Sequence, residues 1–165
     1  SKKKFDEDGL LAFTGKRNDI IFEQAEELFS NIANRKTQSL DINDFDVSFA
    51  RGLSLEDGAA TLTDFTAQII GTSLLSYLPN INNVILKVLV CGGGRKNKIL
   101  IDKIKKNISK NLQIYLIDDY GVNGDFVESQ AFAYLAIRSI LKMPISFPET
   151  TGCDQPSTGG EIIKN

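Results

Sequence analysis

The sequence predicts an α/β fold in which a parallel β–α–β unit is packed by long helices. Residues 84–91 form a nearly continuous apolar run rich in β-branched side chains, and a second apolar run follows at residues 112–117. Runs of this kind are typical of parallel strands buried on both faces. A strand, a helix and a strand in this order form a parallel crossover. The length of 165 residues suits one domain, so we expect a single domain over residues 1–165.

Helices are predicted on the N-terminal side of the first strand. Apolar residues recur at helical spacing from about residue 20, and again after Ser54. Ser54 is a good N-cap, and Asp57 follows three residues later, as in a capping box. Residues 5–16 show no such period and are expected to be loop and extended chain.

Two further helices are predicted on the C-terminal side. Asn97 is a favourable N-cap for the crossover helix between the two strands. A last helix, from about residue 126 to residue 142, is apolar almost all round and is therefore expected to be buried. Residues 146–165 contain several Pro and Gly residues and are expected to be mainly loop.

Composition and charge exclude several classes of function. The formal net charge is −2 and the Lys and Arg residues are scattered, so nucleic acid is not an expected partner. No apolar stretch reaches the ~18 residues of a membrane span, so no membrane contact is expected. The chain contains no histidine, which excludes Ser-His-Asp and Cys-His catalysis within it. Its two cysteines make no disulfide framework; we expect a cytoplasmic protein with Cys91 buried and reduced.

A glycine triplet is the first candidate binding site. Gly92, Gly93 and Gly94 directly follow the first predicted strand and precede the crossover helix. A glycine-rich turn at this place lets the backbone approach a phosphate or ribose, and the helix N-terminus attracts anions. The residues that follow, Arg95-Lys96-Asn97, match neither a P-loop nor the dinucleotide fingerprint. The alternative is a tight turn that merely needs positive φ angles.

The second candidate site lies between the second strand and the last helix. Gly121 and Gly124 frame a turn that ends in Asp125, and Glu128 follows three residues later. One interpretation is a capping pair, with Asp125 as N-cap and Glu128 at the third helical position. The other is that Glu128 contacts a substrate hydroxyl or a water molecule.

A series of short motifs runs through nearly the whole chain. They are FDEDG at residues 5–9, SLDINDF at 39–45, SLEDGAATLT at 54–63, CGGGRKN at 91–97, GVNGD at 121–125 with Glu128, and TG at 151–152. In this order and spacing they resemble the C-terminal part of the anhydro-N-acetylmuramic acid kinases, which belong to the actin/sugar-kinase/chaperone ATPase superfamily.

The resemblance implies a fold, a reaction and site residues. The fold would be the ribonuclease-H-like half of an actin-like ATPase. The reaction would open the 1,6-anhydro bond of anhydro-N-acetylmuramic acid with water and transfer the γ-phosphoryl group of ATP, with Mg²⁺, to O6. Gly92, Gly93 and Gly94 would lie against the nucleotide, with Arg95 and Asn97 bordering the site. Glu128 would be a catalytic acid near the sugar.

The chain also departs from the family. Family members are about twice as long, and their N-terminal half carries a Gly-Thr-Ser-x-Asp-Gly phosphate loop and a catalytic aspartate. Neither occurs in these 165 residues, and Cys153 stands where the family usually has alanine. The expected partners are therefore the amino-sugar substrate, the N-terminal half of the same enzyme and a second copy in a homodimer. The isolated chain is expected to be inactive, because phosphoryl transfer needs charge stabilisation from both sides.

Two other functions remain open from the residues alone. The chain is alternatively a non-catalytic ATP-binding or assembly module that pairs with a separate partner. It is alternatively an unrelated α/β nucleotide-binding protein such as a methyltransferase, in which Asp118 or Asp119 after the second strand would contact a ribose.

Overall fold

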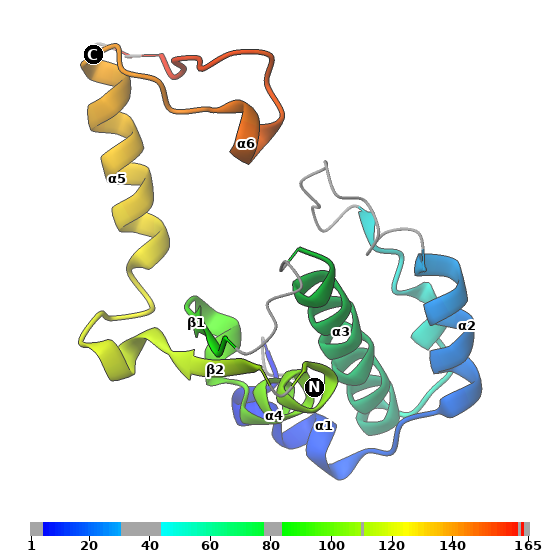
Figure 1. Ribbon diagram of the computed structural model, residues 1–165. Helices are drawn as coiled ribbons and strands as arrows, with labels where there is room; N and C mark the ends of the chain where they lie inside the picture. The colour runs from blue at the N-terminus through cyan, green and yellow to red at the C-terminus, as the bar shows by residue number, and fades with distance from the viewer. Residues whose placement is uncertain (1–4, 31–43, 78–83, 110, 162, 164–165) are drawn as a thin grey trace.

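The computed structural model describes residues 5–30, 44–77, 84–109, 111–161 and 163 (Figure 1). Most of the motif at residues 39–45 lies outside them. The longer elements are α2 (Asp19–Phe29), α3 (Leu55–Tyr77), β1 (Leu86–Val90), α4 (Lys98–Asn107), β2 (Leu112–Leu116) and α5 (Val127–Ile140). The shorter ones are η1 (Glu7–Gly9), α1 (Leu10–Thr14), η3 (Ser48–Ala50), η4 (Gly93–Lys96), η5 (Ile117–Tyr120) and α6 (Pro148–Thr151).

The parallel β–α–β unit is confirmed. β1 pairs with β2 in parallel, with Leu86 opposite Leu112 and Val90 opposite Leu116, and α4 connects the two strands. The carboxyl ends of both strands therefore lie at the same edge of the sheet. This edge leads into η4 on one strand and into η5 on the other.

One face of the sheet is covered by helices. α4 packs against the long α3, which also contacts α1 and α2. The core between sheet and helices contains buried Ala67, Ile101, Ile104 and Ile114. A second apolar cluster, beyond α3, joins buried Phe22 and Phe65 to the partly buried Phe29, Phe45 and Phe49. Both clusters meet on α3, so this helix is the centre of the helical layer.

The opposite face of the sheet is open. Burial alternates along β1, and the side chains of Lys87 and Leu89 are exposed. Leu89 keeps 44% of its surface accessible. The expectation of strands buried on both faces is therefore wrong for the residues described, and Cys91, expected to be buried, is exposed as well. The apolar run has the composition of a strand that is buried on both faces, but the described elements cover only one face of the sheet.

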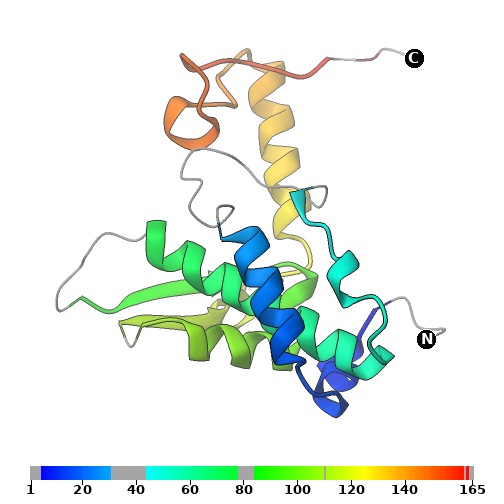
Figure 2. The same cartoon turned by 90° about the vertical axis from the view of Figure 1, so that its right-hand side faces the viewer.

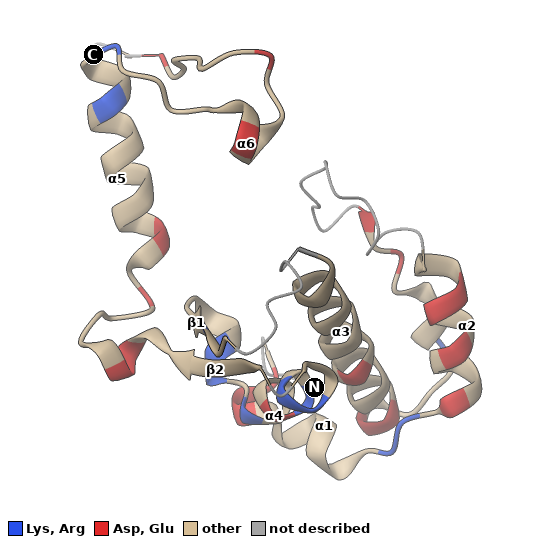
Figure 3. Cartoon of the chain, in the orientation of Figure 1, with Lys and Arg blue, Asp and Glu red and all other residues tan. Residues whose placement is uncertain are grey.

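The last helix is also exposed, contrary to prediction. No residue of α5 is buried, and Phe132 keeps 65% of its surface accessible. Figures 1 and 2 show α5 leading away from the sheet and from the α3 layer, with α6 near its far end. α5 makes none of the extensive contacts that join α3 to α4 and α1. In Figure 3 its charged residues lie near its two ends, so an uncharged middle faces solvent.

The N-terminal segment is more ordered than the sequence predicted. Residues 5–16 were expected as loop, but they contain η1 and α1. The carboxylate of Asp6 accepts hydrogen bonds from the backbone N–H groups of Leu11 and Ala12, at 2.8 and 3.0 Å. These bonds satisfy the backbone amides at the start of α1, which have no partner within the helix. With five residues, α1 is too short to show a helical pattern of apolar residues in the sequence. None of the helices in the described parts of the chain is both long and apolar enough to cross a membrane.

Candidate functional site

The glycine triplet forms an open turn at the carboxyl end of β1. Gly92 has a φ of 77°, whereas neither Gly93 nor Gly94 has a positive φ. A Cβ atom placed on any of the three would meet no heavy atom within 4 Å. The need for a positive φ therefore accounts for Gly92 alone. Gly93 and Gly94 leave free space in front of the backbone, which is what close approach of a ligand requires.

The helix that follows the turn begins at a side-chain cap. Asn97 Oδ1 accepts a hydrogen bond from the N–H of Leu100 at 2.9 Å, which confirms the predicted N-cap. This side chain also packs against η1, where a Cβ on Gly9 would overlap it. Asn97 thus fixes the start of α4 beside the turn. Its predicted contact with a nucleotide stays a prediction.

Arg95 is the buried charge of the site, with 6% of its surface accessible. Its Nε and Nη2 donate to the two carboxylate oxygens of Asp118, at 2.6 and 2.9 Å. Its Nη1 donates to Asp125 Oδ1 at 2.7 Å and to the carbonyl oxygen of Gly92 at 2.9 Å. The second oxygen of Asp125 accepts from Lys96 Nζ at 2.6 Å. We call Arg95, Lys96, Asp118 and Asp125 the Arg95 cluster.

Backbone bonds reinforce the Arg95 cluster. The N–H of Gly92 donates to the carbonyl oxygen of Gly124 at 3.0 Å, and the N–H of Gly124 donates to Asp118 Oδ1 at 3.3 Å. Gly124 also lies directly against the guanidinium, since a Cβ there would come within 2.7 Å of Arg95 Cζ. The glycine triplet and the loop at residues 121–125 are thereby joined into one unit.

The ion pairs set the protonation states of the cluster. Hydrogen bonds from Arg95 hold the pKa of the Asp118 carboxyl well below its usual range, and the same cause lowers the pKa of Asp125, with a further contribution from Lys96. The two carboxylates in turn raise the pKa of Arg95 above its ordinary value. All three groups stay charged throughout the neutral pH range.

The second predicted site does not contain the capping pair that its spacing suggested. α5 begins at Val127, and no side chain caps it, so the interpretation of Asp125 as its N-cap is wrong. The Asp125 carboxylate binds Arg95 and Lys96 instead. Glu128 is exposed in the first turn of α5, and no hydrogen bond or ion pair joins it to the glycine turn among the described residues. Its catalytic role stays a prediction.

Sequence reasoning missed the connection between Arg95 and the two aspartates. Asp118 had been considered only as a ribose ligand of the methyltransferase alternative, but its carboxylate is occupied by the guanidinium. One signal was present: an arginine follows one parallel strand and acids follow the next, at edges that must coincide.

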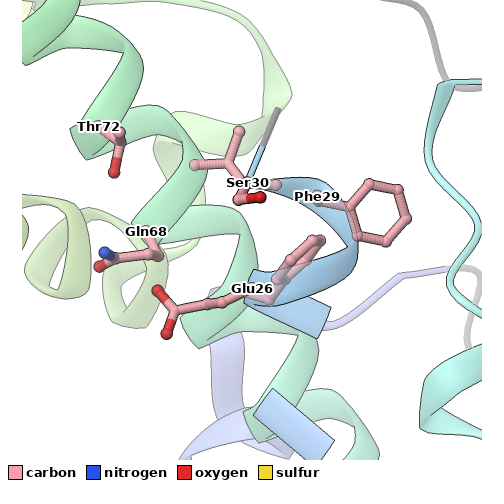
Figure 4. A pocket seen from close by; sticks show the side chains of 7 residues that line it. Glu26, Phe29, Ser30, Gln68 and Thr72 are labelled. Carbon is pink, nitrogen blue, oxygen red and sulfur yellow. The ribbon is translucent and has the colours of Figure 1, made fainter. Parts of the chain in front are cut away.

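Two hollows of the described surface lie away from the glycine triplet. One, of about 340 Å³, lies between α2 and α3; Figure 4 shows the Glu26 carboxylate and the Gln68 amide near one another along it. The other, of about 320 Å³, lies between α1, α3 and α4 and contains the ion pair of Lys103 with Asp64, at 2.7 Å. Neither is lined by the glycine triplet or by Glu128. The described residues contain no group of three or more acidic or Cys side chains arranged to hold a metal ion.

Comparison with known proteins identifies the family. The family model for anhydro-N-acetylmuramic acid kinase matches residues 1–165. The anhydro-N-acetylmuramic acid kinase of Pelagibacter ubique is 52% identical over 165 residues, which are 100% of this chain and 44% of that protein. The kinase of Zymomonas mobilis is 40% identical over 160 residues, 96% of this chain and 41% of that protein. The chain thus spans less than half the length of these relatives, and it belongs to the anhydro-N-acetylmuramic acid kinase family.

Proposed function

We propose that the chain supplies the nucleotide-binding, C-terminal part of an anhydro-N-acetylmuramic acid kinase, built as one half of an actin-like ATPase. The complete enzyme would add water across the 1,6-anhydro bond and transfer the γ-phosphoryl group of ATP to O6. The products are N-acetylmuramic acid 6-phosphate and ADP. Membership of the family over the whole chain supports the class of reaction.

The open glycine triplet is the observation that carries the nucleotide assignment. Three successive residues without side chains face free space at the carboxyl end of a parallel strand. The capped N-terminus of α4 lies just behind them, and its first backbone N–H groups favour a negative charge. This is the position at which α/β proteins bind phosphorylated ligands. ATP is accordingly the proposed ligand, with Mg²⁺ carried largely by its phosphates.

The remaining catalytic groups belong to the rest of the enzyme under this proposal. The 165 residues contain no Gly-Thr-Ser-x-Asp-Gly phosphate loop. That loop and the base that activates water would come from the part of the relatives that this chain does not match. Glu128 would face the sugar from the start of α5. The isolated chain should therefore bind nucleotide without completing phosphoryl transfer.

The exposed apolar surfaces support a polypeptide partner. The open face of β1, with Leu89, and the middle of α5, with Phe132, are apolar surfaces of kinds usually covered in a complete protein. These surfaces equally favour the second candidate function, an assembly module that pairs with a separate chain. One experiment separates the two candidate functions. If the chain is part of the kinase, mixing it with the complementary half of the enzyme restores turnover, whereas an assembly module does not restore it.

Filling the turn tests the nucleotide assignment. Gly93→Val and Gly94→Val each place a side chain where the structure has free space and no positive φ, so both variants should fold. ATP at 100 times its dissociation constant should stabilise the unaltered chain by about 2.7 kcal/mol in a thermal titration. The two variants should lose this stabilisation, while Thr66→Val, an exposed change on α3, should keep it.

Two results would contradict the proposal. Equal stabilisation of the unaltered chain and of both glycine variants by ATP would place the nucleotide elsewhere. Robust turnover of the isolated chain with ATP, Mg²⁺ and the anhydro-sugar would show that the catalytic groups are already present within it.

A further inference from the structure

We infer that Arg95 is a positioning residue that locks the glycine triplet to the loop at residues 121–125, so that the two loops meet the nucleotide as one rigid surface. This inference rests on the proposed function for its ligand, but the coupling of the two loops can be measured without nucleotide.

The guanidinium is turned inward. Arginine has five N–H donors in a planar fork. Four of these donors form hydrogen bonds in the structure, two to Asp118, one to Asp125 and one to the carbonyl oxygen of Gly92. With 6% of the residue accessible, little of the positive charge is left to meet an incoming phosphate. The arrangement is suited to holding protein groups in place.

The groups that Arg95 holds come from three separate segments of the chain. Gly92 is the first residue of the triplet after β1, Asp118 lies in η5 after β2, and Asp125 ends the loop before α5. Each segment alone is a short turn whose backbone has few bonds to the sheet. Through one side chain, the carbonyl oxygen of Gly92 becomes fixed relative to both carboxylates. The direct hydrogen bond from the N–H of Gly92 to the carbonyl oxygen of Gly124 adds a second connection between the glycine triplet and the loop at residues 121–125.

The geometry calls for arginine in particular. Asp118 is bound by two parallel N–H groups, which a planar guanidinium offers and an ammonium does not. Lys96 provides the internal comparison, because its side chain is 60% exposed and its ammonium group forms an ion pair with Asp125 alone among the described residues. The two neighbouring cations thus differ in role: Arg95 joins three segments, and Lys96 supports one.

Hydrogen exchange in the absence of nucleotide tests the coupling. In Arg95→Lys, the hydrogen-bonded amides of Gly92, Gly121 and Gly124 should exchange about ten- to hundredfold faster, as expected for the loss of charged hydrogen bonds. Amides of Ile101 and Ile104 in the core of α4 should keep their rates, which shows that the variant is folded. Lys96→Met should change the loop rates by less than about threefold, because one exposed ion pair is worth little.

Chemical rescue separates positioning from general stability. Arg95→Ala should weaken ATP binding by about tenfold or more, and added methylguanidinium should restore part of both the affinity and the slow exchange. The same additive should not improve Arg95→Lys, whose side chain fills the cavity. If Arg95→Ala does not fold, Asp125→Asn serves as the second variant, and it should accelerate exchange of the hydrogen-bonded Gly92 amide.

The two proposals fail differently. Unchanged exchange at the amides of Gly92, Gly121 and Gly124 in folded Arg95→Lys overturns the coupling, even if Gly93→Val abolishes ATP binding. Faster exchange in Arg95→Lys, together with no ATP binding by the unaltered chain, upholds the coupling and overturns the nucleotide assignment.

Discussion

Gly71 on α3 lies directly against Asn107, the last residue of α4. A Cβ on Gly71 would come within 2.8 Å of Asn107 Cβ and 3.0 Å of its carbonyl oxygen. The two helices can approach this closely only because residue 71 has no side chain. This contact is part of the packing of α4 against α3, which fixes the position of α4 and of the glycine turn that precedes it.

Gly71→Ala should therefore destabilise the chain. Alanine in a helix interior is ordinarily favourable over glycine by about 0.5–1 kcal/mol. Overpacking at the contact with Asn107 should outweigh this gain and give a net loss of about 1–3 kcal/mol. Gly58→Ala on the same helix is the matched control, since its nearest neighbour would lie 3.9 Å away, and it should stabilise. Urea unfolding measures both; equal effects of the two changes would contradict the packing argument.

Thr61→Val should cost about 1–3 kcal/mol, because the part-buried N–H of Asn18 is left without its acceptor. The hydroxyl of the fully buried Thr61 accepts a hydrogen bond from the N–H of Asn18 at 3.0 Å and donates one to the carbonyl oxygen of Asp57 at 2.7 Å. Valine preserves the shape and removes both bonds. Thr66→Val removes a similar bond to Leu62 on the exposed side of α3 and should change stability by less than about 0.5 kcal/mol. Similar urea midpoints for the two variants would contradict the role given to Thr61.

Acid should weaken the fold in a way that depends on Asp118. Hydrogen bonds from Arg95 lower the pKa of this carboxyl in the folded chain, whereas an unfolded aspartate has a pKa of about 3.9. The unfolded chain therefore takes up the proton first as the pH falls. The stabilisation is complete at neutral pH and declines below about pH 5.

Asp118→Asn should thus be less stable than the unaltered chain at pH 7, and the difference should narrow as the pH falls from about 5 to 3. Urea unfolding at a series of pH values measures the difference. Asp119→Asn is the control, because Asp119 forms no ion pair with the described residues. A difference that stays constant from pH 7 to pH 3 would show that the ion pair does not contribute.

Phe132→Ser on α5 should leave the isolated chain almost unchanged in stability, within about 0.5 kcal/mol, because the ring is already exposed. It should weaken association with the complementary half of the enzyme, if that half covers α5, by about tenfold or more. Titration of the two halves measures this. Phe13→Ser on α1, which is equally exposed, is the control and should not affect association. Equal affinities for both variants would contradict the assignment of α5 as the covered surface.

The elements that the sequence predicted well depend on local signals. The β–α–β unit follows from two apolar runs, and Asn97 caps α4 through a bond within its own first turn. Burial of α5 could not be predicted in this way, because a helix that is apolar all round is buried only where something packs on it. The same reason explains the open face of β1.

The candidate site shows a second limit. Asp125 and Glu128 have the spacing of a capping pair, which is a local signal, but Asp125 binds a guanidinium 30 residues away in sequence. A charge-assisted bond to a buried arginine is stronger than a cap. Local spacing therefore drew attention to this loop but assigned the wrong partner to Asp125.

The two glycines of the loop at residues 121–125 are required for different reasons. Gly121 has a φ of 77° and no neighbour within 4 Å of its Cβ position, so its constraint is one of chirality, and a D-amino acid would satisfy it. Gly124 has no positive φ, and its constraint is one of volume, because the smallest L side chain would displace the guanidinium. A D-alanine at residue 121 should therefore leave the loop intact. At residue 124 even the methyl group of L-alanine should displace the Arg95 guanidinium, and the loop at residues 121–125 would then lose its connection to the glycine triplet.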